Sequence, residues 1–206
     1  MGHTCLNICL VASSAGNAGI AAALACKKMG LPCTVILPNT TPQSAANNIR
    51  EHGANVEYFG NDVNESEIEA RSRITDDSMF YISPYDHPMI WEGHSSLIDE
   101  LKSDLKGDIP SLIVCSVGGG GLMLGILQGL QRNNWQHVPV LAMETSGAES
   151  LNASVAAGKI VQLDKISSIA KSLGSKEVAQ AALDESKKHP GKVHSRVCHD
   201  TEAIQG

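Results

Sequence analysis

Four consecutive glycines at 118–121 lie between two apolar segments of the chain. The segment before them, 112–117, is typical of a buried strand, and the segment after them, 122–131, has the spacing of a helix. Four residues without side chains allow the backbone to curl around an anion, with several N–H groups and the positive end of the helix dipole directed at it. Because four glycines also cost folding entropy, a binding role is favoured over a plain turn. We therefore predict a phosphate site at this turn.

The residues around these glycines exclude a P-loop, because no Gly-Lys-Ser/Thr follows them. A dinucleotide fingerprint nearly fits, since Gly118-x-Gly120 is present, but Met123 stands where the third glycine belongs. Shifting the frame by one residue places Leu124 there, which fits no better. Glu144, at the end of the next predicted strand, lies where an acid that binds a ribose is expected. A Rossmann-type dinucleotide site therefore stays open as an alternative.

A second glycine-rich turn, Ser13-Ser-Ala-Gly-Asn-Ala-Gly19, also joins a predicted strand to a predicted helix. Its amides and hydroxyls lie at a helix N-terminus, where they form an anion site that suits a carboxylate. Asn17 adds a side-chain amide that both donates and accepts hydrogen bonds, which suits a ring hydroxyl or phenolate. The alternative is a helix N-cap followed by an Asn turn. The two turns together indicate a phosphorylated cofactor that meets an amino acid.

Short apolar runs alternate with helical patterns along the chain. The runs predicted as strands are 6–12, 33–37, 55–59, 79–82, 112–117 and 138–143. The patterns predicted as helices are 19–29, 42–52, 65–74, 90–105, 122–131 and 148–157. Strands this apolar, alternating with helices, favour parallel sheets covered on both faces, so the predicted fold class is α/β. A stretch with two prolines at 83–88 breaks the alternation and is typical of a crossing between two lobes.

The composition excludes several kinds of partner. The 206 residues carry a formal net charge of −6 and only 3% are aromatic, so neither a basic surface nor stacking platforms for nucleic acid are expected. The six cysteines show no metal-ligand spacing and lie in apolar segments, which favours buried thiols in a reducing compartment. The apolar run near the N-terminus is too short to span a membrane and lacks the flanks of a signal peptide. We expect a cytoplasmic protein without nucleic-acid or membrane partners.

Four motifs occur in order along the chain: Ser-Ser-Ala-Gly-Asn-Ala-Gly at 13–19, Tyr-Ile-Ser-Pro-Tyr-Asp-His-Pro-Met-Ile-Trp-Glu-Gly-His at 81–94, Ser-Val-Gly-Gly-Gly-Gly-Leu at 116–122 and Ala-Met-Glu-Thr-x-Gly-Ala at 142–148. With them the chain resembles, over nearly its whole length, the serine and threonine dehydratases of the pyridoxal-phosphate fold type II group. The similarity is greatest to the animal liver-type L-serine dehydratases.

This resemblance implies a two-lobed fold. Residues 1–90 would form a smaller lobe with the substrate loop, and residues 91–206 would form part of a larger lobe with the phosphate turn. The implied reaction is pyridoxal-phosphate-dependent β-elimination from L-serine and L-threonine, giving a 2-oxo acid and ammonia. The implied partners are a small amino-acid substrate and a second copy of the chain in a homodimer.

The resemblance also assigns roles to residues at matching positions. The residues that would hold the cofactor phosphate are Gly118, Gly119, Gly120, Gly121 and Leu122. Asn17 would bond the 3-hydroxyl oxygen of the pyridine ring. The residues that would line the substrate-carboxylate loop are Ser14, Ala15, Gly16 and Asn17.

Glu144 takes a different role under the resemblance. In these enzymes the matching glutamate helps to surround a monovalent cation together with backbone carbonyls, here those of Gly118, Ala148, Leu173 and Ser175. Hard oxygen ligands of this kind suit potassium. A solvated carboxylate at the end of a strand is the alternative for Glu144.

Ala15 bears on the type of reaction that the resemblance implies. In the related racemases a serine on this part of the loop exchanges a proton on the second face of the substrate. An alanine has no hydroxyl with which to do so, and elimination is therefore favoured over racemisation.

The family's chemistry also needs a lysine that forms a Schiff base with the cofactor. The resemblance places this lysine in a Ser-x-Lys segment upstream of the 13–19 turn, and nothing in residues 1–12 matches it. The segment that sets a cysteine or serine against the pyridine nitrogen is also absent. We therefore expect a chain that is truncated at both ends relative to the family and inactive by itself. The alternative is a non-catalytic protein that binds pyridoxal phosphate or a partner.

Overall fold

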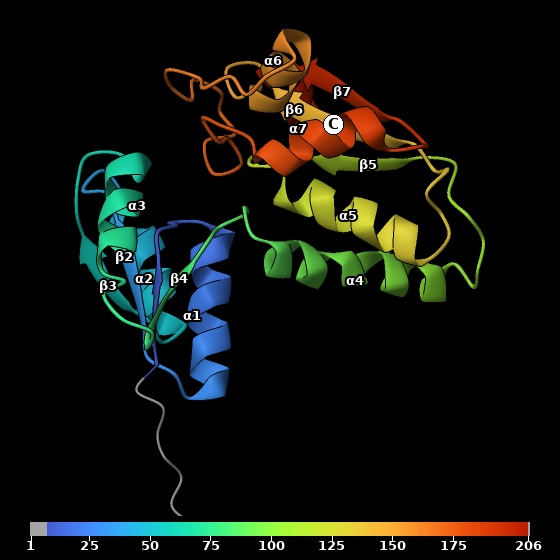
Figure 1. The fold of residues 1–206 in the computed structure, drawn as a ribbon. Coiled ribbons are helices and arrows are strands. Elements are labelled where there is room, and N and C mark those ends of the chain that lie inside the picture. The colour runs from blue at the N-terminus through green and yellow to red at the C-terminus, as the bar shows by residue number, and fades with distance from the viewer. Residues whose placement is uncertain (1–7, 206) are drawn as a thin grey trace, which may run out of the picture. The chain divides into compact units, whose positions relative to one another are not determined.

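The computed structural model describes residues 8–205. The chain divides into two compact units, Met1–Pro84 and Tyr85–Gly206 (Figure 1). Each unit contains one parallel β-sheet with helices packed against it, which confirms the predicted α/β class. The division falls inside the proline-containing stretch at 83–88, whereas the resemblance placed the boundary at residue 90. Within the described part of the chain, no helix has both the length and the apolar character needed to cross a membrane.

The first unit is built on four parallel strands in the order β3-β2-β1-β4. Its elements are β1 (Cys9–Ala12), α1 (Asn17–Met29), β2 (Cys33–Leu37), α2 (Gln43–Glu51), β3 (Asn55–Tyr58), α3 (Val63–Ser72) and β4 (Met79–Ile82). The strand predicted at 6–12 begins at Cys9, and residues 6 and 7 lie outside the described range.

Helices cover both faces of this sheet. Along β2, the buried side chains of Val35 and Leu37 belong to one core cluster with α1 and α2, and that of Ile36 belongs to another with α3. In Figure 1, α1 and α3 accordingly lie on opposite sides of the strands. The chain leaves β1 toward β2 and β3 and then returns past β1 to β4, so the winding reverses between β1 and β4. Open α/β sheets bind ligands beyond the carboxyl ends of the strands at such a reversal.

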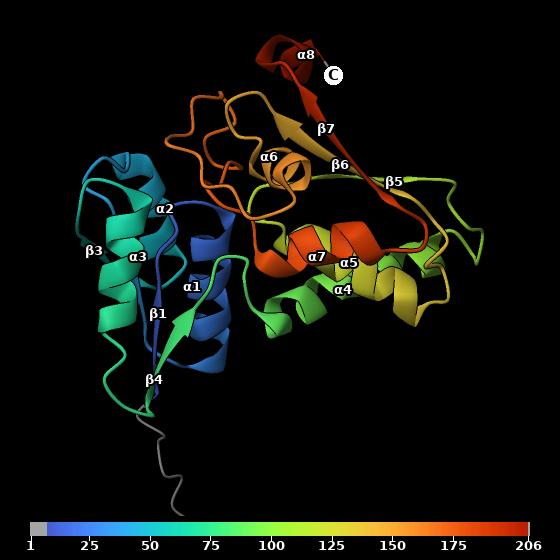
Figure 2. The same ribbon diagram turned by 45° about the horizontal axis from the view of Figure 1, so that its top comes forward.

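The second unit is built on three parallel strands in the order β5-β6-β7. Its elements are α4 (Pro88–Asp104), β5 (Ile113–Ser116), α5 (Gly121–Arg132), β6 (Val140–Thr145), α6 (Ser150–Ala157), α7 (Gln180–Lys188), β7 (Val193–Cys198) and α8 (Asp200–Gln205). Because the strands are parallel, the turns that follow β5 and β6 and the start of α8 all lie at the same edge of the sheet. Figure 2 shows the irregular segment that joins α6 to α7 and the helix α8 that follows β7.

Helix α7 and strand β7 were not predicted from the sequence. Helix α7 buries only Ala182 and Leu183 and is otherwise polar, so it has few apolar residues by which a helix could be recognised. Strand β7 lies at the edge of its sheet, and its sequence, Val-His-Ser-Arg-Val-Cys, contains no apolar run by which a strand could be recognised. The strand predicted at 138–143 is found two residues later, at Val140–Thr145.

Helices α4 and α5 approach closely because glycines of α5 face α4. A Cβ on Gly125 would lie 2.4 Å from the Cβ of His94, and a Cβ on Gly129 would lie 2.6 Å from the carbonyl oxygen of Ser95. Side chains at these two positions would therefore force the helices apart.

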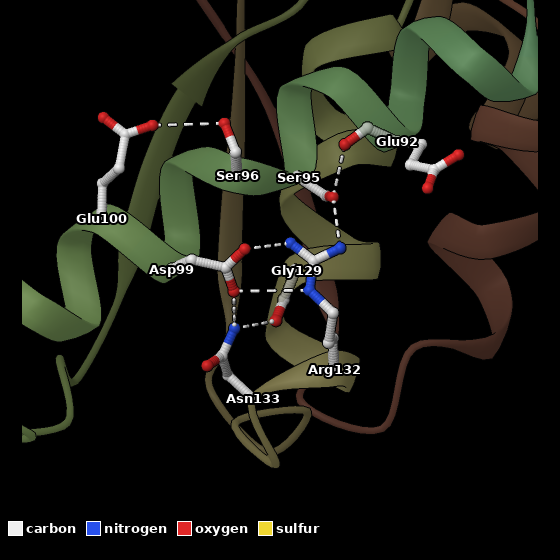
Figure 3. A network of polar contacts seen from close by, with 8 residues as sticks. All are labelled: Glu92, Ser95, Ser96, Asp99, Glu100, Gly129, Arg132 and Asn133. Carbon is white, nitrogen blue, oxygen red and sulfur yellow. Dashed lines mark hydrogen bonds and ion pairs between the residues drawn. The ribbon is translucent and has the colours of Figure 1, made fainter.

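Polar contacts fasten the C-terminal end of α5 to α4 (Figure 3). The guanidinium of Arg132 donates to the buried Ser95 Oγ at 2.8 Å and forms an ion pair with the Asp99 carboxylate. The side-chain amide of Asn133 donates to Asp99 Oδ1 at 2.6 Å. The helix that begins at the tetraglycine turn is thus held along its length by its neighbour.

Candidate functional site

The tetraglycine turn connects β5 to α5, as predicted. Gly120 is the N-cap residue of α5, has a left-handed φ of 92° and provides no side-chain hydrogen bond to the helix. The first N–H groups of an α-helix have no acceptor within the helix. The turn therefore has the backbone form that binds phosphate at a helix N-terminus.

Protein atoms pack closely behind these glycines. A Cβ on Gly118 would lie 1.9 Å from the carbonyl oxygen of Leu173, and a Cβ on Gly119 would lie 2.2 Å from the ring of Tyr85. A Cβ on Gly121 would lie 2.6 Å from the Tyr85 carbonyl oxygen. The need for glycine at these positions thus comes first from the packing of the turn itself, a cause that the sequence argument did not include. This packing fixes the curve of the backbone, and a fixed curve of amides at a helix N-terminus fits a phosphate group.

The 13–19 turn lies at the reversal of the first sheet, directly after β1. Gly16 is the N-cap of α1 and no side chain caps this helix, so the alternative of a helix N-cap followed by an Asn turn lacks its side-chain cap. A Cβ on Gly19 would lie 1.9 Å from the carbonyl oxygen of Ser14, because that carbonyl folds over the first turn of the helix. Asn17 is the first helical residue and its side chain is exposed. This leaves its amide on the surface at the carboxyl edge of the strands.

A hydroxyl pair that the sequence argument missed fixes the start of this turn. Ser13 is 3% exposed, and its Oγ lies 2.8 Å from the Tyr81 hydroxyl on β4. The Arg71 guanidinium stacks on the Tyr81 ring at 4.1 Å and pairs with Glu67 at 2.7 Å. Burial raises the pKa of Tyr81 to about 12, so this hydroxyl keeps its proton near neutral pH. The one signal in the sequence was the position of Tyr81 at the start of the 81–94 motif.

The carboxylate of Glu144 is buried rather than solvated, which overturns the surface alternative. Its residue is 1% exposed, and its two oxygens accept hydrogen bonds of 2.8 Å from the N–H groups of Leu151 and Asn152 at the start of α6. Burial raises the pKa of Glu144 to about 7, although these two hydrogen bonds oppose the shift. A carboxylate held in this way cannot reach a ribose, so the Rossmann-type alternative loses its acidic residue.

The structure brings together part of the predicted cation site. The Leu173 carbonyl lies against Gly118, and a Cβ on the adjoining Gly174 would lie 3.1 Å from the Cβ of Ala148. The hydroxyl of Ser175 donates to the Glu177 carbonyl at 2.7 Å. Among residues 8–205, no three His, Cys, Asp or Glu side chains form a metal-binding group.

Other features of the described residues lie apart from the two turns. A cavity of about 660 Å³ runs along α5 and α7, and its lining, which includes Trp91, Gln131 and His189, contains none of the predicted site residues. The lysines of the described range are exposed, except Lys176, which is half-buried.

The class of protein is defined by two parallel α/β units, each of which has a glycine-rich turn between a strand and a helix. The chain belongs to the family of pyridoxal-phosphate dependent enzymes, whose sequence model matches residues 4–206. It is 44% identical to the human protein named serine dehydratase-like over 99% of this chain, and 46% identical to human L-serine dehydratase/L-threonine deaminase over 94%. The fold is similar to that of the L-serine ammonia-lyase of Rhizomucor miehei, with a TM-score of 0.88 and 35% identity over 97% of this chain. The chain spans 63%, 58% and 62% of the lengths of these three relatives.

Proposed function

We propose that this chain carries the phosphate turn and the substrate loop of a pyridoxal-phosphate-dependent L-serine and L-threonine dehydratase. The observation that carries this proposal is the rigidly packed tetraglycine turn at the N-terminus of α5. Its support is the membership of the chain in the pyridoxal-phosphate family and its likeness to proteins named serine dehydratase.

In this proposal each turn binds a different part of the reactants. The amides of residues 118–122 hold the cofactor phosphate, and Asn17 donates to the ring oxygen of the cofactor. The loop at Ser14, Ala15 and Gly16 receives the substrate carboxylate. The cofactor, once bound, supplies an electron sink for the substrate α-carbon. Because Ala15 has no hydroxyl, it cannot return a proton to the second face of the substrate, which favours elimination.

A chimera tests this function. In it, residues 8–205 replace the matching region of the human serine dehydratase-like protein, to which the chain is 44% identical. We expect the chimera to release pyruvate from L-serine and 2-oxobutanoate from L-threonine, with the human protein as positive control. Reduction of NAD by a hydroxy acid, without release of a 2-oxo acid from serine, would instead favour the dinucleotide alternative.

We further propose that a potassium ion binds among the carbonyls of Gly118, Ala148, Leu173 and Ser175, next to Glu144. The support is the contact of Leu173 with Gly118 and of Gly174 with Ala148, together with a buried carboxylate at the end of β6. The negative charge of Glu144 is already stabilised by two amides of α6, and an ion would stabilise it further.

The stability of the folded chain is expected to fall with rising pH, because of Glu144. Burial raises the pKa of Glu144 from 4.5 to about 7, so the folded state keeps a proton that the unfolded state has already released. The contribution of Glu144 is therefore most favourable below its unfolded pKa and is lost as the pH rises through the folded pKa, by about 3 kcal/mol in all. Urea unfolding from about pH 5 to about pH 8 measures this fall, and Glu144→Gln should remove it.

The effect of potassium distinguishes the two roles considered for Glu144, which are neighbour of a bound cation and cap of α6. A cation beside the carboxylate favours the ionised form, so potassium chloride should lower the pKa and reduce the fall in stability. Tetramethylammonium chloride at equal ionic strength is the control, because its cation is too large for a cage of carbonyls. Identical pH profiles in both salts would leave Glu144 as a cap for α6 and nothing more.

We also propose that the protein is a cytoplasmic homodimer. The support for a reducing compartment is that Cys26, Cys33 and Cys115 are buried free thiols. Analytical ultracentrifugation of the purified chimera tests the assembly, and a single species with the mass of one chain would contradict it.

A further inference from the structure

The ring of Tyr85 lies flat against the tetraglycine turn. A Cβ on Gly119 would lie 2.2–2.4 Å from three atoms of this ring. Gly119 is not among the glycines with positive φ, so its backbone conformation is open to alanine. The Tyr85 ring is therefore what excludes a side chain at this position.

Tyr85 is itself anchored at both ends. Its carbonyl oxygen accepts a hydrogen bond of 2.7 Å from Trp91 Nε1. Its hydroxyl donates to the Glu177 carbonyl at 3.3 Å and lies 3.4 Å from the Ser175 hydroxyl oxygen. The ring thus joins the turn to the segment that leads into α7.

A second contact sets the orientation of the peptide group between Gly119 and Gly120. The carbonyl oxygen of Gly119 accepts a hydrogen bond of 2.9 Å from the N–H of Ala179. In a planar trans peptide the C=O and N–H bonds point in opposite directions. The N–H of Gly120 therefore points away from Ala179, on the side of the turn opposite the 175–179 segment.

We infer that Tyr85 is a positioning residue of the phosphate turn. Its ring supports Gly119 while Ala179 holds the Gly119 carbonyl, so that the Gly120 N–H is directed at the ligand before the ligand arrives. This inference depends on the proposed function only in that the ligand is a phosphate group. Pre-orientation of this kind lowers the cost of ordering the turn on binding.

Binding of pyridoxal phosphate to the 206-residue chain, measured by equilibrium dialysis, tests the role of the ring. We expect Tyr85→Phe, which keeps the ring, to bind within about twofold of the wild type, and Tyr85→Leu to bind at least about tenfold more weakly. Ile98→Ala is the matched control, because it removes a buried side chain of α4 that packs against Gly129, near the end of α5 remote from the turn. It should lower stability and leave binding unchanged.

Hydrogen exchange at the Ala179 amide tests the same inference without a ligand, because this amide donates to the Gly119 carbonyl. In Tyr85→Leu the Ala179 amide should exchange at least about tenfold faster, whereas amides of β6 should keep their protection. If the wild type binds no pyridoxal phosphate but this exchange still responds, the inference stands and the proposed function fails. Unchanged exchange at Ala179 in Tyr85→Leu would overturn the inference, and so would binding by this variant that equals the measured binding of the wild type.

Discussion

The 206-residue polypeptide, incubated with pyridoxal phosphate and L-serine, is expected to release no pyruvate and to form no stoichiometric covalent bond with the cofactor. The reaction needs a lysine held next to the cofactor as its anchor and base. The lysines of the described range are exposed or, for Lys176, half-buried, and none belongs to a Ser-x-Lys motif upstream of the 13–19 turn. Borohydride reduction after addition of the cofactor, followed by peptide mass mapping, measures any covalent bond.

The pattern of labelling distinguishes the outcomes of this experiment. We expect scattered, substoichiometric labelling of surface lysines, with non-covalent binding of the cofactor by the tetraglycine turn. The chimera with the human protein is the positive control, since it contains the segments that the family uses. A single lysine labelled to completion, together with pyruvate, would show that the catalytic residue lies among these 206. Lys176 is the residue to inspect first, because it lies in the segment behind the turn.

Gly19→Ala is expected to destabilise the first unit by about 3 kcal/mol, although alanine normally stabilises a helix. A Cβ at this position would lie 1.9 Å from the Ser14 carbonyl oxygen and 3.3 Å from Ile49 Cδ1. The first of these atoms belongs to the backbone, so the loop that we propose for the substrate carboxylate must move. Urea unfolding gives the change in stability, and hydrogen exchange at residues 14–18 reports the displaced loop.

Gly93→Ala is the matched control for this substitution. Gly93 lies inside α4, and a Cβ there would meet no atom within 4 Å. Its replacement should therefore stabilise the protein by about 0.5–1 kcal/mol, the ordinary gain for glycine to alanine in a helix. If the two variants changed stability in the same direction, the close approach of Ser14 to Gly19 would not be the cause.

Much of the architecture follows from local patterns. The apolar run 33–37 is a strand at the predicted residues, because its side chains are apolar enough to be buried in a parallel sheet. The run 79–82 is also a strand at the predicted residues, although it lies at the edge of its sheet and is only partly buried. Both glycine turns join a strand to a helix, as predicted. They could be predicted because the residues that indicate such a junction are neighbours in the sequence. The edge strand β7 and the polar helix α7 leave no such mark and were missed.

The tertiary structure decided which groups each candidate site residue contacts. The residue patterns marked Gly118 and Glu144 as candidates, and partners for them came only from the resemblance to a known family. The fold sets Leu173 against Gly118, and it directs the Glu144 carboxylate to the amides of α6, which excludes the alternative of a solvated acid for that residue. These contacts join residues that are distant along the chain, and they depend on how strands pair and helices pack. Local periodicity determines which segments are strands and helices, whereas the environment of a side chain is determined only once those segments have been packed together.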